Sequence, residues 1–341
     1  MRRRLAPPIV LAAVLLAVLG GCGGNGDGGG ASGNPTEQVP EAGGLRKTIE
    51  AAEHPSKAEF QAPGGRTLQE VADNIGGGQQ QAALASSIFT VGTNRLAFGV
   101  IDQGAQFVYG KTAVYVARTP DSKARGPYVA PADVLMTKPP YRSKQAATEK
   151  DPFSAVYAAQ VPFDRPGKWS VLTVTEVDGR QVAAPAQVSV VTRAQDKVPE
   201  VGERAPSVQT DTVASARGDV ASIDTRVPPD DMHDKSFADV LGKKPVALLF
   251  ATPQLCQSRV CGPVVDIAAQ LKSRYGDRVQ FIHQEVYKDN DVNKGLRPPL
   301  ERFHLPTEPW LFVVDANGRI TARLEGSFGV RAFDRAIQSA L

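Results

Sequence analysis

The sequence predicts a chain of two folded domains, an antiparallel β-sandwich followed by an α/β domain. Three observations lead to this prediction. The length of 341 residues is typical of two domains rather than one. Short segments in which apolar and polar residues alternate, with no convincing helix among them, fill residues 85–194. From Ser236 onward, apolar strand-like runs alternate instead with amphipathic helical segments.

The first 21 residues have the pattern of an export signal. A basic start, Arg2 to Arg4, precedes an apolar stretch at residues 9–19 that is too short to be a good spanning helix. The stretch ends in Leu19-Gly20-Gly21-Cys22, which resembles a lipobox, the bacterial signal in which a cysteine is diacylated and becomes the new N-terminus. The resemblance implies a lipid on Cys22 and a location at the extracytoplasmic face of the cell membrane. The alternatives are an ordinary signal peptide with a chance cysteine and an uncleaved anchor.

Residues 22–84 are expected to carry little regular structure. Residues 23–33 are glycine-rich with almost no apolar side chains, as in a flexible tether. The following residues are polar and mixed in character, and we expect poor order through much of them. The pattern allows short helices at 45–52 and 67–74.

Residues 85–194 are predicted to form the β-sandwich. Leu96, Phe98 and Val100 alternate on one face of a first strand. Further strand-like runs follow at 113–117, 155–161, 169–174 and 188–191. Asp178-Gly179 separates the last two runs and is typical of a hairpin turn. Five or more short strands favour an immunoglobulin-like sandwich, and the polar segment 119–151 is expected to be a loop.

Residues 195–231 are interpreted as a linker, and residues 232–341 as the α/β domain. Its elements are predicted from apolar runs, helical periodicity and turn residues. They are a short helix at 236–241, a strand at 245–251, a helix at 262–275, a strand at 279–286, a short helix at 296–304, strands at 310–315 and 320–325 joined through Asn317-Gly318, and a closing helix at 330–341.

Charge and motif content exclude several classes of function. Arg2, Arg3 and Arg4 account for the whole formal charge of +3, so the mature chain is balanced and a nucleic-acid partner has no electrostatic support. We see no catalytic serine–histidine–aspartate arrangement, phosphate loop or zinc-ligand spacing, and we assign no cofactor and no metal. With Cys22 assigned to the lipid, Cys256 and Cys261 remain, and in an extracytoplasmic compartment they will tend to pair.

The α/β domain resembles the thioredoxin superfamily, in particular its membrane-tethered thiol–disulfide oxidoreductases. Cys261-Gly262-Pro263, at the N-terminus of the helix predicted at 262–275, resembles the first three residues of the family's Cys-Gly-Pro-Cys motif. Pro309, directly before Trp310-Leu311-Phe312, matches the proline whose peptide bond is cis in the family. The resemblance implies thiol–disulfide exchange with exported proteins or with a redox partner.

The resemblance also implies roles for individual residues. Cys261 would attack, because a helix N-terminus favours the thiolate and Arg259 adds positive charge. Cys256 would resolve the mixed disulfide, which would form beside Glu308 and Pro309.

The sequence departs from the family pattern at several positions. Val264 stands where the second cysteine of the motif belongs, so Cys256 has to act from the preceding loop across a Cys-x4-Cys spacing. The buried acid of the family would fall near Leu249, in an apolar strand. Glu308 places a negative charge near the thiols, which opposes thiolate formation.

These departures leave two alternatives open. The first is a non-catalytic binding lipoprotein in which a Cys256–Cys261 disulfide is structural. The second is a copper chaperone similar to the Sco type, in which the two thiols would bind cuprous ion. Its histidine would have to come from His304 or His283, and His283 alternates with Ile282 as an ordinary strand-edge residue does.

Overall fold

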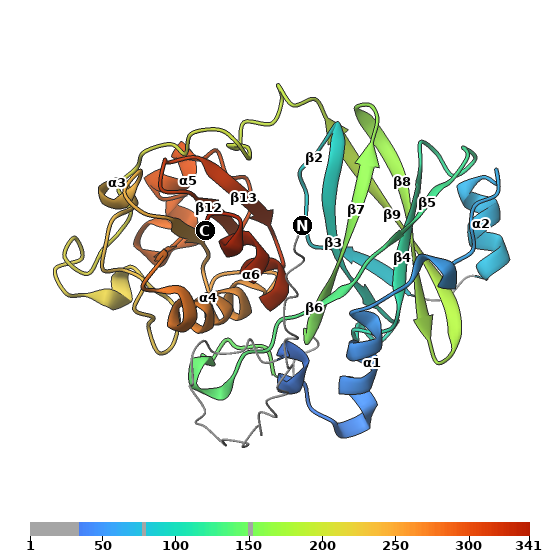
Figure 1. Cartoon of the computed structure of the whole chain (residues 1–341), viewed down its shortest axis with the longest axis horizontal. Helices are drawn as coiled ribbons and strands as arrows, with labels where there is room; N and C mark the ends of the chain where they lie inside the picture. Colours follow the sequence, from blue (N-terminus) through green and yellow to red (C-terminus); the bar gives the residue numbers. More distant parts are fainter. Residues whose placement is uncertain (1–33, 77–79, 149–152) are drawn as a thin grey trace, which may run out of the picture. The chain divides into compact units, whose positions relative to one another are not determined.

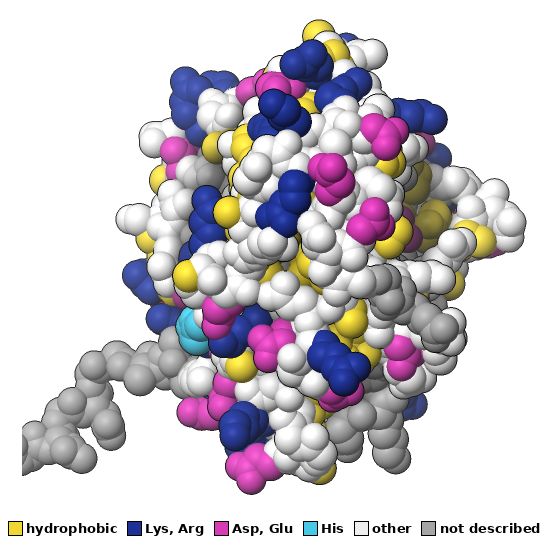
Figure 2. Space-filling view, turned by 90° about the vertical axis from the view of Figure 1, so that its right-hand side faces the viewer, with side chains coloured by type: hydrophobic (Ala, Val, Ile, Leu, Met, Phe, Trp, Pro, Cys, Tyr) yellow, Lys and Arg dark blue, Asp and Glu magenta, His cyan; other side chains and the backbone are white. Residues whose placement is uncertain are grey.

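The computed structural model describes residues 34–76, 80–148 and 153–341 (Figure 1). The signal peptide, the lipidation residue Cys22 and the glycine-rich tether lie outside the described residues, and they stay predictions. Among the described residues, no helix combines the length and the hydropathy that a membrane crossing needs. Basic and acidic side chains are interspersed over the face shown in Figure 2, with small hydrophobic groups between them.

Two β-sheets form the N-terminal domain. The first has the order β1-β3-β7-β6, with β1 (Gln81–Leu84), β3 (Gly92–Ile101), β6 (Ala132–Val134) and β7 (Ala155–Phe163). The second has the order β2-β9-β8-β4-β5, with β2 (Phe89–Thr90), β4 (Thr112–Ala117), β5 (Arg125–Val129), β8 (Gly167–Val177) and β9 (Arg180–Val191). Pairing is antiparallel except between β2 and β9.

The two sheets of this domain share one hydrophobic core. Phe98 on β3 and Val161 on β7 lie in the same cluster as Val116 on β4 and Val171 on β8. Side chains that point to one face of each sheet therefore meet between the sheets, as the alternating pattern predicts. The finer assignment to an immunoglobulin-like sandwich stays a prediction.

The hairpin between β8 and β9 lies where the sequence predicts it. The strands pair from Gly167 with Val190 to Val177 with Arg180. Asp178 and Gly179 both have positive φ values, 50° and 74°. A type I′ turn, the commonest two-residue hairpin connection, requires positive φ at both of its central residues.

The prediction of a continuous loop at 119–151 is wrong. This segment contains β5, β6 and the 3₁₀ helix η4 (Pro139–Tyr141). These strands are only five and three residues long, and β5 contains Gly126-Pro127. Such short strands give no readable alternation of apolar and polar residues.

Residues 34–76 are more regular than the sequence analysis expected. Two helices, α1 (Leu45–Ala52) and α2 (Leu68–Ile75), coincide with the two that the pattern allowed. Ile49 of α1 joins the main core, and Val71 of α2 packs in a smaller cluster with side chains of β4 and β8. This burial orders a segment whose polar composition suggested little structure. Short 3₁₀ helices accompany them: η1 (Pro35–Gln38), η2 (Ala42–Gly44) and η3 (Lys57–Glu59).

The C-terminal domain contains a four-stranded sheet of order β11-β10-β12-β13. Its strands are β10 (Val246–Phe250), β11 (Gln280–Gln284), β12 (Trp310–Val314) and β13 (Ile320–Glu325). The β10–β11 pair is parallel, and the other pairs are antiparallel. The helices are α3 (Phe237–Val240), α4 (Cys261–Tyr275), α5 (Pro298–Arg302) and α6 (Val330–Gln338), with the 3₁₀ helices η5 (Val220–Ser222), η6 (Lys288–Asn290) and η7 (Val292–Lys294).

Helices cover both faces of this sheet (Figure 1). Leu249 of β10 packs in the cluster that contains side chains of α4 and α6, whereas Leu248 packs in the cluster that contains side chains of α3 and α5. A strand–helix–strand unit is thus followed by a hairpin and a closing helix, which is the arrangement that the thioredoxin resemblance predicts.

The two domains are joined by a buried carboxylate. Asp133, on β6 of the sandwich, accepts hydrogen bonds at the start of α6 from the backbone N–H groups of Gly329 (3.1 Å), Arg331 (2.9 Å) and Ala332 (2.8 Å). Asp133 is therefore the cap of α6, although it comes from the other domain. The hydrophobic core is also continuous between the domains, since side chains of α4 and α6 belong to the same cluster as the sandwich core.

We expect Asp133→Ala to lower the free energy of unfolding by about 2–3 kcal/mol, because three helix N–H groups lose a charged acceptor. Urea denaturation of the full chain measures this change. Asp121→Ala, at an exposed loop position, is the matched control and should change stability by less than about 0.5 kcal/mol. Equal effects of the two substitutions would show that the cap does not couple the domains.

Candidate functional site

The loop after β10 brings the two cysteines together. It runs from Ala251 to Val260, and α4 begins at Cys261. The backbone N–H of Cys256 donates to the carbonyl of Thr252 (3.1 Å), and that of Arg259 donates to the carbonyl of Cys256 (3.2 Å). These two turns fold the loop back, so that Cys256 reaches Cys261. Both cysteines are free thiols in the structure, and the predicted disulfide between them stays a prediction.

The two thiols have opposite acid–base properties. The pKa of Cys256 is lowered to about 6, first by a hydrogen bond from the Cys261 thiol and further by one from Ser258, whose Oγ lies 3.2 Å from Sγ. The pKa of Cys261 is raised well above its ordinary value, first by complete burial and then by its hydrogen bond to Cys256. Cys256 is 8% exposed and Cys261 is 0% exposed, so the less buried thiol is also the more acidic one.

The sequence predicts that the N-terminus of α4 favours the thiolate at Cys261, and the order in which the two thiols attack stays a prediction. Cys261 is the first residue of α4, one residue before the predicted start of the helix, and its burial raises its pKa. Arg259 is exposed and has a positive φ of 60°. Glu308 acts electrostatically on both thiols and raises the pKa of each, as the sequence analysis expects of its charge.

A loop of the sandwich domain lies against the first turn of α4. A Cβ atom at Gly262 would come within 2.3 Å of the carbonyl oxygen of Gln145, so only glycine allows this close approach. Two residues earlier along the loop, Ser143 donates to the Asp266 carboxylate from both its N–H (3.0 Å) and its Oγ (3.1 Å). The glycine that resembles the family motif therefore has a packing role of its own here.

Two cavities flank the cysteine loop. The Cys256 cavity, about 410 Å³, is lined by Cys256, Arg259, Pro263, Lys144, Gln145 and Phe153 among others. The Glu308 cavity, about 310 Å³, is lined by Glu308, Ser258, Val260, Leu84, Phe107 and Phe153 among others. Both domains contribute walls to each cavity. The sandwich thus lines part of the space beside Cys256.

The residues before β12 lie at the edge of the site. The Glu308–Pro309 peptide bond is cis, as the family resemblance predicts. Glu308 is half-buried, and its carboxylate accepts a hydrogen bond from the Tyr287 hydroxyl (3.4 Å). Burial raises the pKa of Glu308. The pKa of Tyr287 is raised to about 12, first by burial and then by Glu308 and both thiols.

The positions that depart from the family pattern are buried and apolar. Val264 is fully buried in the first turns of α4, and Leu249 lies within the apolar strand β10. Sequence reasoning did not single out Ser258 or Tyr287. Neither belongs to a motif, and only the folded loop brings them to the cysteines.

The histidines proposed for copper do not join the thiols. His304 is exposed, and His283 is fully buried with Nδ1 2.8 Å from an oxygen of Asp230. Within the part of the chain that the structure describes, the cysteines belong to no group of three or more candidate metal ligands. The interpretation of His283 as an ordinary edge residue is wrong, because residues 224–233 cover that side of the edge strand β11. Four candidate ligands, including His283, form a separate cluster there.

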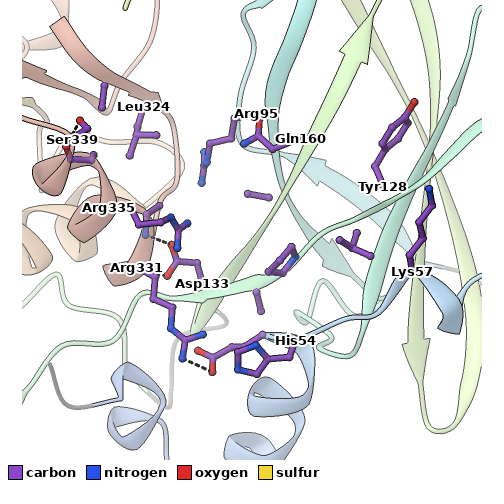
Figure 3. A pocket seen from close by; sticks show the side chains of 18 of the residues that line it. His54, Lys57, Arg95, Tyr128, Asp133, Gln160, Leu324, Arg331, Arg335 and Ser339 are labelled. Carbon is purple, nitrogen blue, oxygen red and sulfur yellow. Dashed lines mark hydrogen bonds and ion pairs between the residues drawn. The ribbon is translucent and has the colours of Figure 1, made fainter. Parts of the chain in front are cut away.

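Figure 3 shows a larger cleft of about 1030 Å³, which we call the arginine cleft, and none of the described residues that line it belongs to the cysteine loop. Its lining includes Arg95, Arg331 and Arg335 together with Asp133. Arg95 donates to the carbonyl of Ser327 (2.8 Å), and burial lowers the pKa of Arg95 to about 10. Arg331 forms an ion pair with the buried carboxylate of Glu53 (2.9 Å). Two of the three arginines therefore already hold segments of the protein together.

No protein-family model and no curated protein matches the chain. Two solved structures from Chlorobium tepidum are similar to part of the chain. One, described as a thiol:disulfide interchange protein DsbE, has a TM-score of 0.31 and 16% sequence identity, over 41% of this chain and 97% of that chain. The other, a thiol:disulfide interchange protein of the thioredoxin family, has a TM-score of 0.29 and 18% identity, over 42% of this chain and 98% of that chain.

Proposed function

We propose that this protein is an extracytoplasmic, lipid-anchored thioredoxin-like protein that exchanges thiols and disulfides through Cys256 and Cys261. The observation that supports this most strongly is the difference between the two thiols. Cys256 combines a pKa of about 6 with access to a cavity, and Cys261 lies buried behind it with a raised pKa. An attacking thiol needs a large thiolate fraction and access, whereas a resolving thiol needs only to reach its neighbour.

The proposed reaction transfers two electrons from the cysteine pair to a substrate disulfide. The Cys256 thiolate attacks one substrate sulfur, forming a mixed disulfide and releasing the other substrate sulfur as a thiolate, which takes up a proton. Cys261 then loses its proton and attacks the Sγ of Cys256. The Cys256–Cys261 disulfide forms, and the second substrate thiolate leaves. Run in reverse, the same steps oxidise a dithiol, so the direction depends on the partner's potential.

Substrate would bind across the cysteine loop, with Glu308 and Pro309 beside the mixed disulfide. The Glu308 cavity offers apolar side chains such as Leu84 and Phe107, and the Cys256 cavity offers polar ones such as Lys144. Because sandwich residues line both, this domain would help to choose among exported protein thiols or redox partners. A lipid on Cys22 would keep the site at the membrane surface, and mass spectrometry of the mature N-terminal peptide tests for it.

The reduction potential of the pair and turnover of insulin disulfides test the proposed function. We expect a potential within the range of thioredoxin-type oxidoreductases, between about −270 and −120 mV, together with insulin reduction above background. A potential below about −300 mV without turnover would instead identify a structural disulfide. Two observations favour a structural disulfide: Cys261 is completely buried, and the apolar strand β10 has no acidic side chain near Leu249 to accept a proton from a thiol.

Alkylation of Cys256 should rise with pH around a midpoint near pH 6. Below this pH the thiol dominates, and above it the reactive thiolate dominates. Iodoacetamide kinetics on the reduced full chain, followed at Cys256 by peptide mass spectrometry, measure the midpoint. Glu308→Gln should move it to lower pH, because the negative charge that raises the pKa is removed. Exposed Glu301→Gln should leave it unchanged. A wild-type midpoint near the ordinary cysteine value of about 8.5 would contradict the assignment of Cys256 as nucleophile.

A further inference from the structure

Four side chains with metal-binding chemistry meet against β11. Three come from the segment that leads into the C-terminal domain, and one comes from the strand itself: Asp224, Asp230, His233 and His283. One candidate ligand atom from each lies within 4.8 Å of all the others. All four side chains are at most 1% exposed. This cluster takes no part in the proposed thiol chemistry.

The strongest indication of a ligand is the imidazole of His233. Neither of its ring nitrogens makes a hydrogen bond to any residue that the structure describes, although the residue is 1% exposed. Its Nε2 lies 3.5 Å from Oδ2 of Asp224 and 3.4 Å from Oδ1 of Asp230. Burying a polar ring without hydrogen bonds is costly, so a buried imidazole in this position indicates a missing partner.

The spacing of these atoms suits a tetrahedral ion. Zinc bonds to histidine nitrogen and carboxylate oxygen are about 2.0–2.2 Å long, which places neighbouring ligand atoms about 3.3–3.6 Å apart. The two distances from His233 fall in this range. Nδ1 of His283 lies 2.8 Å from Oδ2 of Asp230, in a hydrogen bond that the ion would replace, and 3.8 Å from Oδ1 of Asp224. One ligand atom from each of the four residues lies within 4.8 Å of the others, so rotation of the two carboxylates would bring one oxygen of each to the ion.

Neighbouring groups hold the ligands in the orientation that metal binding needs. Nε2 of His283 lies 3.1 Å from the carbonyl oxygen of Ala251, to which it donates, and this leaves Nδ1 facing the carboxylates. The carboxylate of Asp224 accepts from the N–H of Asp230 (2.7 Å), and that of Asp230 accepts from the N–H of Met232 (2.8 Å). Carbonyl and amide groups of this kind commonly orient the ligands of metal sites.

We propose that Asp224, Asp230, His233 and His283 form a closed four-ligand site for a divalent first-row transition-metal ion, with Zn²⁺ the best fit. Two carboxylates balance the charge of the ion, and two imidazoles suit it better than they suit magnesium or calcium. Four buried protein ligands leave no open position, so the site is structural rather than catalytic.

The ion would tie residues 224–233 to β11. The same segment supports the cysteine loop, because the N–H of Gln254 donates to Oγ1 of Thr225 (3.1 Å). The metal site would therefore stabilise the surroundings of the thiols without entering their chemistry.

Metal titration of the full chain tests the site independently of thiol exchange. After treatment with a chelator, the chain should bind one Zn²⁺ or Co²⁺ per molecule. The Co²⁺ spectrum should be that of a tetrahedral nitrogen–oxygen site without thiolate charge-transfer bands. At a hundredfold excess over Kd, Zn²⁺ should raise Tm by roughly 5 °C or more. The Cys256→Ser/Cys261→Ser variant should bind in the same way, since the thiols are not ligands.

Substitutions of the ligands provide the second arm. His233→Gln and Asp230→Asn should lose the bound ion and the increase in Tm, whereas exposed His54→Gln should keep both. If a ligand variant fails to fold, the metal titrations of the wild-type chain and of the double-cysteine variant still decide whether the site binds an ion. The proposal is overturned if the folded wild-type chain binds no stoichiometric ion, if folded His233→Gln retains it, or if the double-cysteine variant loses it.

Discussion

Cys256→Ser should reduce thiol–disulfide exchange to the uncatalysed background, and Cys261→Ser should stop the reaction at a mixed disulfide on Cys256. Serine cannot form the first covalent bond, so the loss at Cys256 is complete. With Cys256 intact and Cys261 replaced, the first attack still occurs but nothing displaces the substrate. Non-reducing electrophoresis and mass spectrometry of the full chain, incubated with a disulfide substrate, measure both outcomes.

The asymmetry between the variants distinguishes the two possible orders of attack. If Cys261 attacked first, the trapped adduct would form in Cys256→Ser instead. In Cys261→Ser the serine hydroxyl can still donate to the Cys256 thiolate, so the adduct should form faster at pH 8 than at pH 6, as a pKa of about 6 at Cys256 requires. If neither variant traps substrate and both lose stability on substitution, the pair is a structural bridge.

Asp266→Ala should lower the free energy of unfolding by about 3–5 kcal/mol, because it leaves a buried guanidinium without its carboxylate. Asp266 lies on α4, five residues after Cys261, and its Oδ1 is 2.9 Å from Nε of Arg226. The two side chains are 1% and 6% exposed. Ser143 of the sandwich binds the other carboxylate oxygen, so the pair connects α4, the lead-in segment and the sandwich.

Urea denaturation of the full chain measures this effect, and two further variants control it. Asp164→Ala removes an aspartate that is paired with Arg125 but is 52% exposed, and it should cost less than about 1 kcal/mol. Asp266→Ala/Arg226→Met removes both buried charges and should be less destabilised than Asp266→Ala alone. A double variant as unstable as the sum of its single variants would show that the unpaired charge is not the cause.

Periodicity and turn residues predicted most of the regular elements, because they depend on local sequence. The apolar run at 245–251 became β10, and the helix predicted at 262–275 became α4 with one additional residue at its start. Asp178-Gly179 and Asn317-Gly318 both join antiparallel strands. Each of these signals lies within the element that it predicts.

The errors arose where distant segments decide the structure. β6 has only three residues, too few to show an alternating pattern. Its Asp133 is buried because α6, from the other domain, packs over it and donates backbone hydrogen bonds to its carboxylate. His283 alternates with apolar neighbours on an edge strand, which suggests exposure, yet residues 224–233 cover it. No local pattern reports that a segment from elsewhere in the chain will bury a polar side chain.

The position of the cysteine pair could be predicted from local sequence alone: after an apolar strand, at the start of a helix, with Pro309 before the following hairpin. Only the folded chain makes the two thiols differ in burial and acidity. Position at a helix end favours a thiolate at Cys261, but burial raises its pKa, and the hydrogen bonds from Cys261 and Ser258 lower that of Cys256. A thiol's pKa depends on solvent and on hydrogen-bond donors in three dimensions, and these are present only once the chain has folded.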